Sequence, residues 1–210
     1  MEPSKARRAL NSLAKMPSPG PAAAFSQVHL CLALLTIGDE SPIGRIELSR
    51  KLGLGEGAAR TIIRRMVQAR IIRTVKEGCV LTNRGQLLYK ALRAKLSNIV
   101  TIDARQLTLD DASVAMVIRG VARRVKKGLE ERDAAIRAGA TGACTLIVDM
   151  GRYVMPTADR NDEINSDDLI IHDLESLLHP KDGDVVTIVS ASNRELAKYG
   201  AIAAALGLLR

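Results

Sequence analysis

The chain has 210 residues, of which 47% are hydrophobic, so it can form two small domains with their own cores and is not a disordered tail. Its formal net charge of +8 is unevenly distributed. Residues 1–98 carry 17 Lys and Arg against 6 Asp and Glu, whereas residues 99–210 carry 14 against 17. A basic half joined to a mildly acidic half indicates that the first half meets a polyanion and the second half has another task.

Scarce residue types narrow the function further. With one Phe, three Tyr and no Trp, the chain can build few of the aromatic platforms on which single-stranded nucleic acids stack, so we expect double-stranded DNA as the polyanion. Its three cysteines and three histidines show no metal-ligand spacing, and the cysteines form no CxxC pair. We therefore expect no metal, no cofactor and no disulfide framework.

The start of the chain predicts the cellular location. A basic segment is followed by the proline-rich residues 16–21 instead of the apolar core of a signal peptide, and no apolar run approaches about 18 residues. We therefore expect a cytoplasmic protein that does not contact a membrane.

The first half divides into an arm and a domain. Residues 1–24 are expected to be a basic N-terminal arm or a packing extension, with a short helix over 5–15 that ends at the prolines. The nearly all-apolar run from Phe25 to Ile37 predicts a buried central helix. A short helix at about 45–52, a turn at Gly53 and an amphipathic helix at about 56–70 then predict a helix-turn-helix unit.

The second helix of this unit has two predicted faces. The inward face carries Ala59, Ile62, Ile63, Met66 and Val67. The outward face carries Arg60, Thr61, Arg64, Arg65 and Gln68. A hairpin over 71–81, with Gly78 at its turn, follows in the position of a wing, and Thr82 is expected to cap a helix from Asn83 to about Leu96.

Several ordered segments carry a resemblance to known proteins. They are Leu48-Ser49-Arg50-Lys51-Leu52-Gly53-Leu54, Arg60-Thr61-Ile62-Ile63-Arg64-Arg65-Met66, Ile71-Ile72 and Leu81-Thr82-Asn83-Arg84-Gly85. Together they resemble bacterial and archaeal winged-helix regulators. The second half, with Arg119-Gly120, the run 128–136 and the small-residue run 138–143, resembles the C-terminal α/β domain of an archaeal winged-helix regulator-like family. This resemblance implies a winged-helix domain over 25–97.

The DNA contacts expected from this arrangement lie on the second helix and the hairpin. Arg can bond guanine through two hydrogen bonds or hold a phosphate, so Arg60, Arg64 and Arg65, with Thr61 and Gln68, are expected to read the groove. Arg73 and Lys76 in the hairpin are expected to contact phosphates. The alternative is a basic face that contacts only water. Glu56 lies at the start of the helix, where a negative charge is favoured by the helix dipole. Alternatively, its carboxylate accepts a hydrogen bond from a cytosine amino group.

The second half, residues 98–210, predicts alternating strands and helices. Strands are expected at 99–103, 112–121, 144–150, 153–155 and 185–189, and helices at 129–138, 169–178 and 194–209, with an acidic loop over 159–168. This order predicts a small α/β domain with a mixed sheet, so the overall class is α+β or α/β. The apolar final helix is expected to be buried in the domain or in a homodimer.

A small anionic ligand is one hypothesis for this domain. The candidate residues combine cationic donors, hydroxyls and backbone amides at turns: Arg119, Arg132, Asp133, Thr141, Gly142, Ser190, Ser192 and Asn193. For Arg132, Asp133, Thr141 and Gly142 the alternative is an ordinary helix-to-strand turn with a local ion pair. For residues 190–193 the favoured alternative is a helix N-cap by Ser192 or Asn193.

The sequence as a whole predicts a DNA-binding transcriptional regulator whose second domain senses a ligand, forms a homodimer, or does both. No recognisable catalytic motif is present, so we do not expect an enzyme. Two alternatives stay open. One is an enzyme with its active site in the α/β domain, and the other is a winged-helix module for protein interaction.

Overall fold

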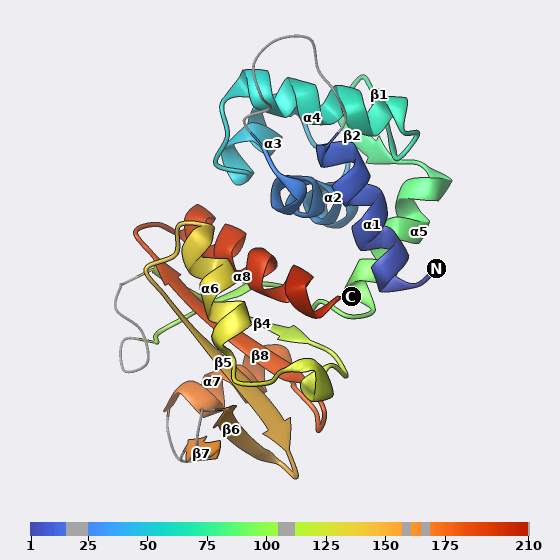
Figure 1. Cartoon of the computed structure of the whole chain (residues 1–210). Coiled ribbons are helices and arrows are strands. Elements are labelled where there is room, and N and C mark those ends of the chain that lie inside the picture. Colours follow the sequence, from blue (N-terminus) through green and yellow to red (C-terminus); the bar gives the residue numbers. More distant parts are fainter. Residues whose placement is uncertain (16–24, 105–111, 157–160, 165–168, 210) are drawn as a thin grey trace. The chain divides into compact units, whose positions relative to one another are not determined.

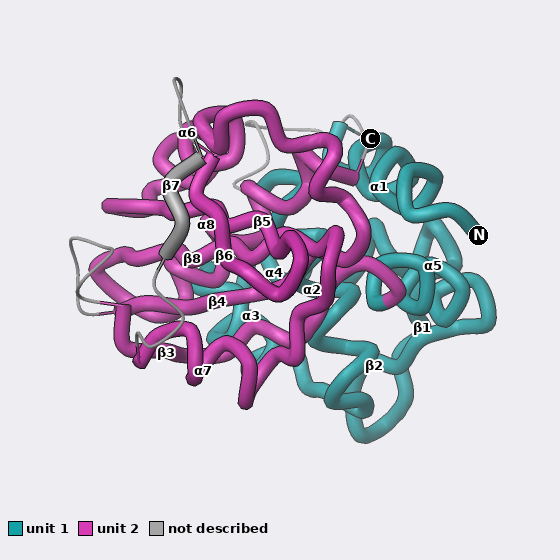
Figure 2. The backbone as a smooth tube through the Cα atoms, turned by 90° about the horizontal axis from the view of Figure 1, so that it is seen from below, with its two compact units in different colours: residues 1–93 teal, residues 94–210 magenta. Residues whose placement is uncertain are grey.

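The structure is a computed structural model, which describes residues 1–15, 25–104, 112–156, 161–164 and 169–209, with only the backbone described for 161–164. The chain forms two compact units, residues 1–93 and residues 94–210 (Figure 2). The predicted proline-rich break at 16–21 and most of the predicted acidic loop lie outside the described residues.

Three helices surround the core of the first unit (Figure 1): α1 (Pro3–Ala14), α2 (Gln27–Glu40) and α5 (Asn83–Arg93). The side chains of Ala6, Leu10 and Leu13 on α1 are buried, and α1 packs against α2 and α5. The segment that was expected to be an arm or a packing extension is therefore part of the core of unit 1. Its apolar residues recur every three to four positions, which places them on one side of the helix.

Helix α2 is buried around most of its circumference, as its run of apolar residues predicts. Its N-terminus is a capping box: the Ser26 hydroxyl accepts a hydrogen bond from Val28 N at 3.1 Å, and His29 Nδ1 accepts one from Ser26 N at 3.2 Å. These two bonds satisfy backbone N–H groups that a helix cannot pair internally.

The remaining elements of unit 1 follow in the predicted order. After α2 come α3 (Arg45–Lys51), α4 (Glu56–Gln68), and the strands β1 (Ile72–Val75) and β2 (Gly78–Leu81), which pair in an antiparallel hairpin. Between α3 and α4 the chain turns at Gly53, whose φ of 64° favours glycine. Thr82 caps α5 as predicted, because its Oγ1 accepts a hydrogen bond from Gly85 N at 3.1 Å.

Unit 2 is built on one six-stranded sheet. In chain order the strands are β3 (Val100–Ile102), β4 (Ala112–Ile118), β5 (Gly142–Asp149), β6 (Arg152–Pro156), β7 (Asn161–Ile164) and β8 (Val185–Ala191). Their spatial order is β3-β4-β8-β5-β6-β7, and each neighbouring pair is antiparallel.

The expectation of a mixed sheet was therefore wrong. Strands β4 and β5 run in the same direction and are joined through a helix, which is the local pattern of a parallel pair. However, β8 lies between them and is antiparallel to both. Strand β7 also falls within the segment expected to be an acidic loop.

Helices cover both faces of the sheet (Figure 1). Helices α6 (Leu129–Arg137) and α8 (Arg194–Leu208) lie together on one face, and α7 (Leu169–Leu178) lies on the other. Helix α7 buries apolar side chains against Val186 and Ile188 of β8. On α8, an added Cβ at Gly200 would lie only 3.0 Å from Cγ1 of Val189, so this small residue permits close packing on the opposite face. The described structure thus buries α8 within unit 2, which is one of the two predicted alternatives.

Candidate nucleic-acid interface and candidate ligand residues

Helix α4 presents two arginines away from the core. Arg60 and Arg64 are exposed and lie one helical turn apart. Ala59, Ile62 and Met66 are fully buried on the opposite side, where they pack into unit 1. The period of 3.6 residues therefore produces the two faces that the sequence predicts.

The other polar residues predicted for this face differ in their placement. Gln68 is exposed at the end of α4. Thr61 is only partly exposed, and its Oγ1 donates a hydrogen bond to the carbonyl oxygen of Gly57 at 3.1 Å. The hydroxyl of Thr61 is thus already bonded within the helix.

The placement of Arg65 on the outward face was wrong. The residue is 3% exposed, and its Nη1 donates hydrogen bonds to the carbonyl oxygens of Leu13 at 2.8 Å and Ala14 at 3.0 Å. Its charge thus satisfies carbonyl groups at the end of α1, which have no partner within that helix. The placement of Val67 was also wrong: it was expected on the inward face, but it is 39% exposed.

The hairpin adds two exposed cations beside α4. Arg73 lies on β1 and Lys76 lies in the turn, and both side chains are exposed. Strand β1 of the hairpin packs against α4. Gly85 lies against the base of the hairpin, because a Cβ added at this residue would be 2.1 Å from the carbonyl oxygen of Ile71. This close approach fixes the base of the hairpin against the first turn of α5.

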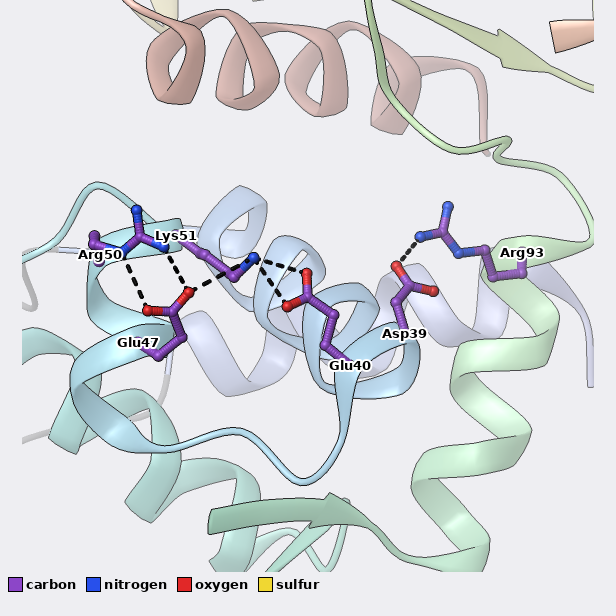
Figure 3. A network of polar contacts seen from close by, with 6 residues as sticks. All are labelled: Asp39, Glu40, Glu47, Arg50, Lys51 and Arg93. Carbon is purple, nitrogen blue, oxygen red and sulfur yellow. Dashed lines mark hydrogen bonds and ion pairs between the residues drawn. The ribbon is translucent and has the colours of Figure 1, made fainter. Parts of the chain in front are cut away.

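Apart from the pair of Glu56 with Arg45 at the start of α4, the ion pairs between described residues of unit 1 lie outside α4 and the hairpin. Figure 3 shows six residues of this network: Asp39, Glu40, Glu47, Arg50, Lys51 and Arg93. Lys51 Nζ lies 2.9 Å from Glu40 Oε2 and 3.7 Å from Glu47 Oε1, and Arg93 pairs with Asp39. The hydrogen bond from Arg50 is the main reason that the pKa of Glu47 is lowered.

These pairs leave a local excess of positive charge. Residues 1–93 carry 16 Lys and Arg against six Asp and Glu, and five of these six acids, all in the described part, form ion pairs. The cationic partners come from α1, α3 and α5. Among the described residues, no ion pair involves Arg60, Arg64, Arg73 or Lys76. The charges of these four side chains are therefore available to a polyanion.

Glu56 has a partner within the protein. Its Oε2 accepts a hydrogen bond from Arg45 Nη2 at 3.2 Å, which joins the start of α4 to the start of α3. Both side chains are substantially exposed, so the pair adds little stability.

Three of the candidate ligand residues meet at one end of the sheet in unit 2. Thr141 N and Oγ1 both donate hydrogen bonds to the carbonyl oxygen of Ser190, at 2.9 and 3.1 Å, and Gly142 pairs with Ser190 across the β5–β8 ladder. The Ser190 Oγ is buried and has no hydrogen-bond partner among the residues that the structure describes. Asn193 Oδ1 accepts a hydrogen bond from Leu196 N at 2.8 Å, so the N-cap expected for Ser192 or Asn193 is supplied by Asn193.

The remaining candidates do not join this group. Arg119 follows Ile118, whose partner on β8 is Val185, so it lies roughly 20 Å along the strand from the row of Ser190. Arg132 and Asp133 are exposed on α6, and the helix runs on for about a turn and a half before the chain reaches Thr141. Arg119 and Ser190 are therefore too far apart along the sheet to line one pocket. Sequence spacing gave no information on which end of the sheet each residue occupies.

The described residues contain neither a metal-ligand cluster nor a helix that could span a membrane. No group of three or more His, Cys, Asp or Glu in these ranges could hold a metal ion. In the same part of the chain, every helix is too short or too polar to cross a membrane.

The chain is similar to known proteins over two segments. Residues 31–87 match the family described as PH0730-like, N-terminal domain, and residues 109–208 match the family described as a domain of unknown function (DUF4443). The structure resembles that of the hypothetical protein PH0730 from Pyrococcus horikoshii OT3, with a TM-score of 0.70 and 26% sequence identity over 86% of this chain and 91% of that chain. No curated protein matches. The chain is therefore similar, in both its N-terminal helical part and its C-terminal sheet domain, to an archaeal protein, which is consistent with membership of an archaeal family.

Proposed function

We propose that unit 1 is a winged helix-turn-helix domain that binds double-stranded DNA, and that the protein is a cytoplasmic transcriptional regulator. One observation carries the proposal: α4 follows α3 through a short turn and presents Arg60 and Arg64 without an ion pair in the described structure, directly before a hairpin with two more exposed cations. A helix of this kind enters the major groove in helix-turn-helix proteins, and the following hairpin serves as the wing.

In this proposal the exposed residues have distinct tasks. Arg60 and Arg64 reach base edges or the phosphates that border the groove, and Gln68 lies at the far end of the same helix. Arg73 and Lys76 contact phosphates from the hairpin. Arg65 has no direct task, because its side chain holds the end of α1 inside unit 1.

Unit 2 supplies ligand sensing or assembly in this proposal. The group formed by Thr141, Gly142 and Ser190 is the candidate region for a small anionic effector, and a homodimer would present two copies of α4 to two half-sites. We assign no catalytic step to either unit.

The test compares two double variants of the full chain. Arg60→Ala/Arg64→Ala removes two charges from the proposed recognition helix, whereas Arg8→Ala/Lys90→Ala removes two exposed charges from α1 and α5 of the same unit. A preferred duplex is first selected from a random pool. The first variant should lose affinity for it by about 1–3 kcal/mol for each residue that reads a base, and the second should change little. Equal affinities of both variants, or the failure of the wild-type chain to bind any duplex, would refute the proposal.

A further inference from the structure

A second basic segment lies in unit 2, outside the proposed DNA-binding domain. Residues 119–127 contain Arg119, Arg123, Arg124, Lys126 and Lys127 and no acidic residue. The unit as a whole carries 15 Lys and Arg against 17 Asp and Glu, so this concentration is not a consequence of its average composition.

The backbone of this segment is held in place at several points. Arg119 N donates a hydrogen bond to Lys95 O at 2.7 Å, and Lys95 Nζ donates one to Arg119 O at 2.8 Å. Gly120 N donates to Asp184 Oδ1 at 2.8 Å, and Ala122 N donates to the carbonyl oxygen of Gly183 at 3.0 Å. The segment then forms a short 3₁₀ helix, Ala122–Arg124. Its conformation is therefore fixed before any partner binds, which lowers the entropy lost on binding.

One of the five cations has a structural task. Arg124 Nη1 donates a hydrogen bond to the carbonyl oxygen of Leu208 at 2.6 Å, at the last residue of α8. A cation is favourable at the C-terminus of a helix, where carbonyl groups lack internal partners. This contact explains why Arg124 is present but does not explain its neighbours.

The neighbouring cations are exposed and poorly compensated. Arg123 and Lys127 are exposed, and neither forms an ion pair among the described residues. Lys126 Nζ lies 3.8 Å from Glu130 Oε1, but its side chain is 81% exposed, so this pair is weak. Like charges held close together repel one another, and the repulsion is relieved when a polyanion binds.

We infer that residues 119–127 form a second phosphate-binding surface, which lies within unit 2 and contacts the backbone of double-stranded DNA. The inference rests on the proposed function for the identity of the polyanion. Exposed Lys and Arg on a fixed backbone are suited to sequence-independent phosphate contacts, which set the position of a protein on a duplex.

The test uses the full chain and a mixed-sequence duplex of about 30 base pairs, roughly three helical turns. The variant Arg123→Ala/Lys127→Ala removes two charges from the segment. The control Arg137→Ala/Arg194→Ala removes two exposed charges from α6 and α8 of the same unit, so net charge changes equally. We expect the first variant to bind about tenfold more weakly at low salt, with the slope of log K against log salt reduced by about 2. We expect less than about a twofold change in the control.

Three further outcomes separate the possible failures. The exchange Arg123→Lys/Lys127→Arg keeps both charges. It should retain wild-type affinity, because phosphate contacts require the charge at these two positions. If Arg60→Ala/Arg64→Ala loses binding while Arg123→Ala/Lys127→Ala matches its control, the second surface is refuted and the proposed function stands. If only Arg123→Ala/Lys127→Ala loses binding, the second surface stands and α4 is not the recognition helix.

Anionic vesicles provide the last arm of the experiment. Phosphatidylserine vesicles offer clustered negative charge without a duplex. We expect the wild type and Arg123→Ala/Lys127→Ala to bind them equally weakly. A loss of vesicle binding in this variant, with duplex binding unchanged, would show that the surface serves a membrane and would overturn the inference.

Discussion

The guanidinium carbon of Arg65 lies 4.9 Å from the centroid of the Phe25 ring inside unit 1. The same guanidinium bonds the end of α1 through the carbonyl oxygens of Leu13 and Ala14. One buried cation thus joins α4, the aromatic ring two residues before α2 and the end of α1. These contacts supply partners for the positive charge in a place from which water is largely excluded.

Replacement of Arg65 by alanine should therefore lower stability more than it affects DNA directly. The change removes two charge-assisted hydrogen bonds to the carbonyl oxygens of Leu13 and Ala14 and empties a buried position, so we expect a loss of about 3 kcal/mol in the free energy of unfolding. Urea unfolding followed by circular dichroism measures it. Arg64→Ala, one residue away and exposed, is the control and should change stability by less than about 0.5 kcal/mol. Equal midpoints for the two variants would contradict the buried role of Arg65.

The position of α1 in the core leads to a second prediction. Leu10 is fully buried between α1 and its neighbours, so Leu10→Ala should cost about 2–5 kcal/mol through lost burial and a residual cavity. Ser12→Ala, on the exposed side of the same helix, should cost little. If Leu10→Ala unfolds at the same urea concentration as Ser12→Ala, α1 is a loose arm after all.

Two glycines of unit 1 should respond to the same substitution in opposite directions. A Cβ at Gly85 would lie 2.1 Å from the carbonyl oxygen of Ile71, so Gly85→Ala forces backbone apart and should destabilise by about 1–3 kcal/mol. No atom of the described residues lies within 4 Å of a Cβ at Gly57 on α4, so Gly57→Ala should be neutral or stabilising by up to about 1 kcal/mol. Thermal unfolding of both variants checks the prediction, and a stable Gly85→Ala protein would rule out the close contact at the base of the hairpin.

The capping box of α2 predicts a dependence of stability on pH. Burial lowers the pKa of His29 from 6.5 to about 4, and the neutral ring accepts the hydrogen bond from Ser26 N. The unfolded chain takes up a proton on this histidine near pH 6.5, whereas the folded chain does so only near pH 4. The stabilising contribution is therefore complete above pH 6.5 and is lost progressively as the pH falls from 6.5 to 4.

A glutamine at position 29 tests this assignment. His29→Gln keeps a side-chain acceptor at the third position of the helix but cannot titrate. Between pH 7 and pH 4 the variant should lose less stability in urea unfolding than the wild type, because other titrating groups contribute equally to both. Parallel pH profiles of the two proteins would show that His29 is not linked to folding.

Local sequence signals predicted much of the fold. The limits of α7 agree with the predicted 169–178, and the β1–β2 hairpin lies where glycine and flanking apolar residues indicate it. These elements are specified by neighbours in the chain, through helical period, turn residues and caps. The same kind of signal placed Arg60 and Arg64 on the exposed side of α4.

Features that depend on distant residues were beyond local signals. Arg65 is separated by 52 residues from Leu13, whose carbonyl oxygen it bonds, and helical period alone puts it with the exposed arginines. In unit 2, β4 and β5 look like a parallel pair until β8 is placed between them. The distance between Arg119 and Ser190 likewise follows from strand register, which the sequence does not display.

The central place of β8 also determines when unit 2 can fold during synthesis. Strands β4 and β5 have no partner in the middle of the sheet until residues 185–191 leave the ribosome, some 36 residues after β5 ends at Asp149. Until then their unpaired backbone groups can bind the strands of other chains. Strands that are so far apart in the sequence pair slowly, because the chain loses the entropy of loop closure before the contacts between the strands can stabilise it. Unit 1 is complete once residue 93 has been synthesised, so it can fold first and would remain attached to a ribosome-bound, incomplete sheet that is vulnerable to aggregation.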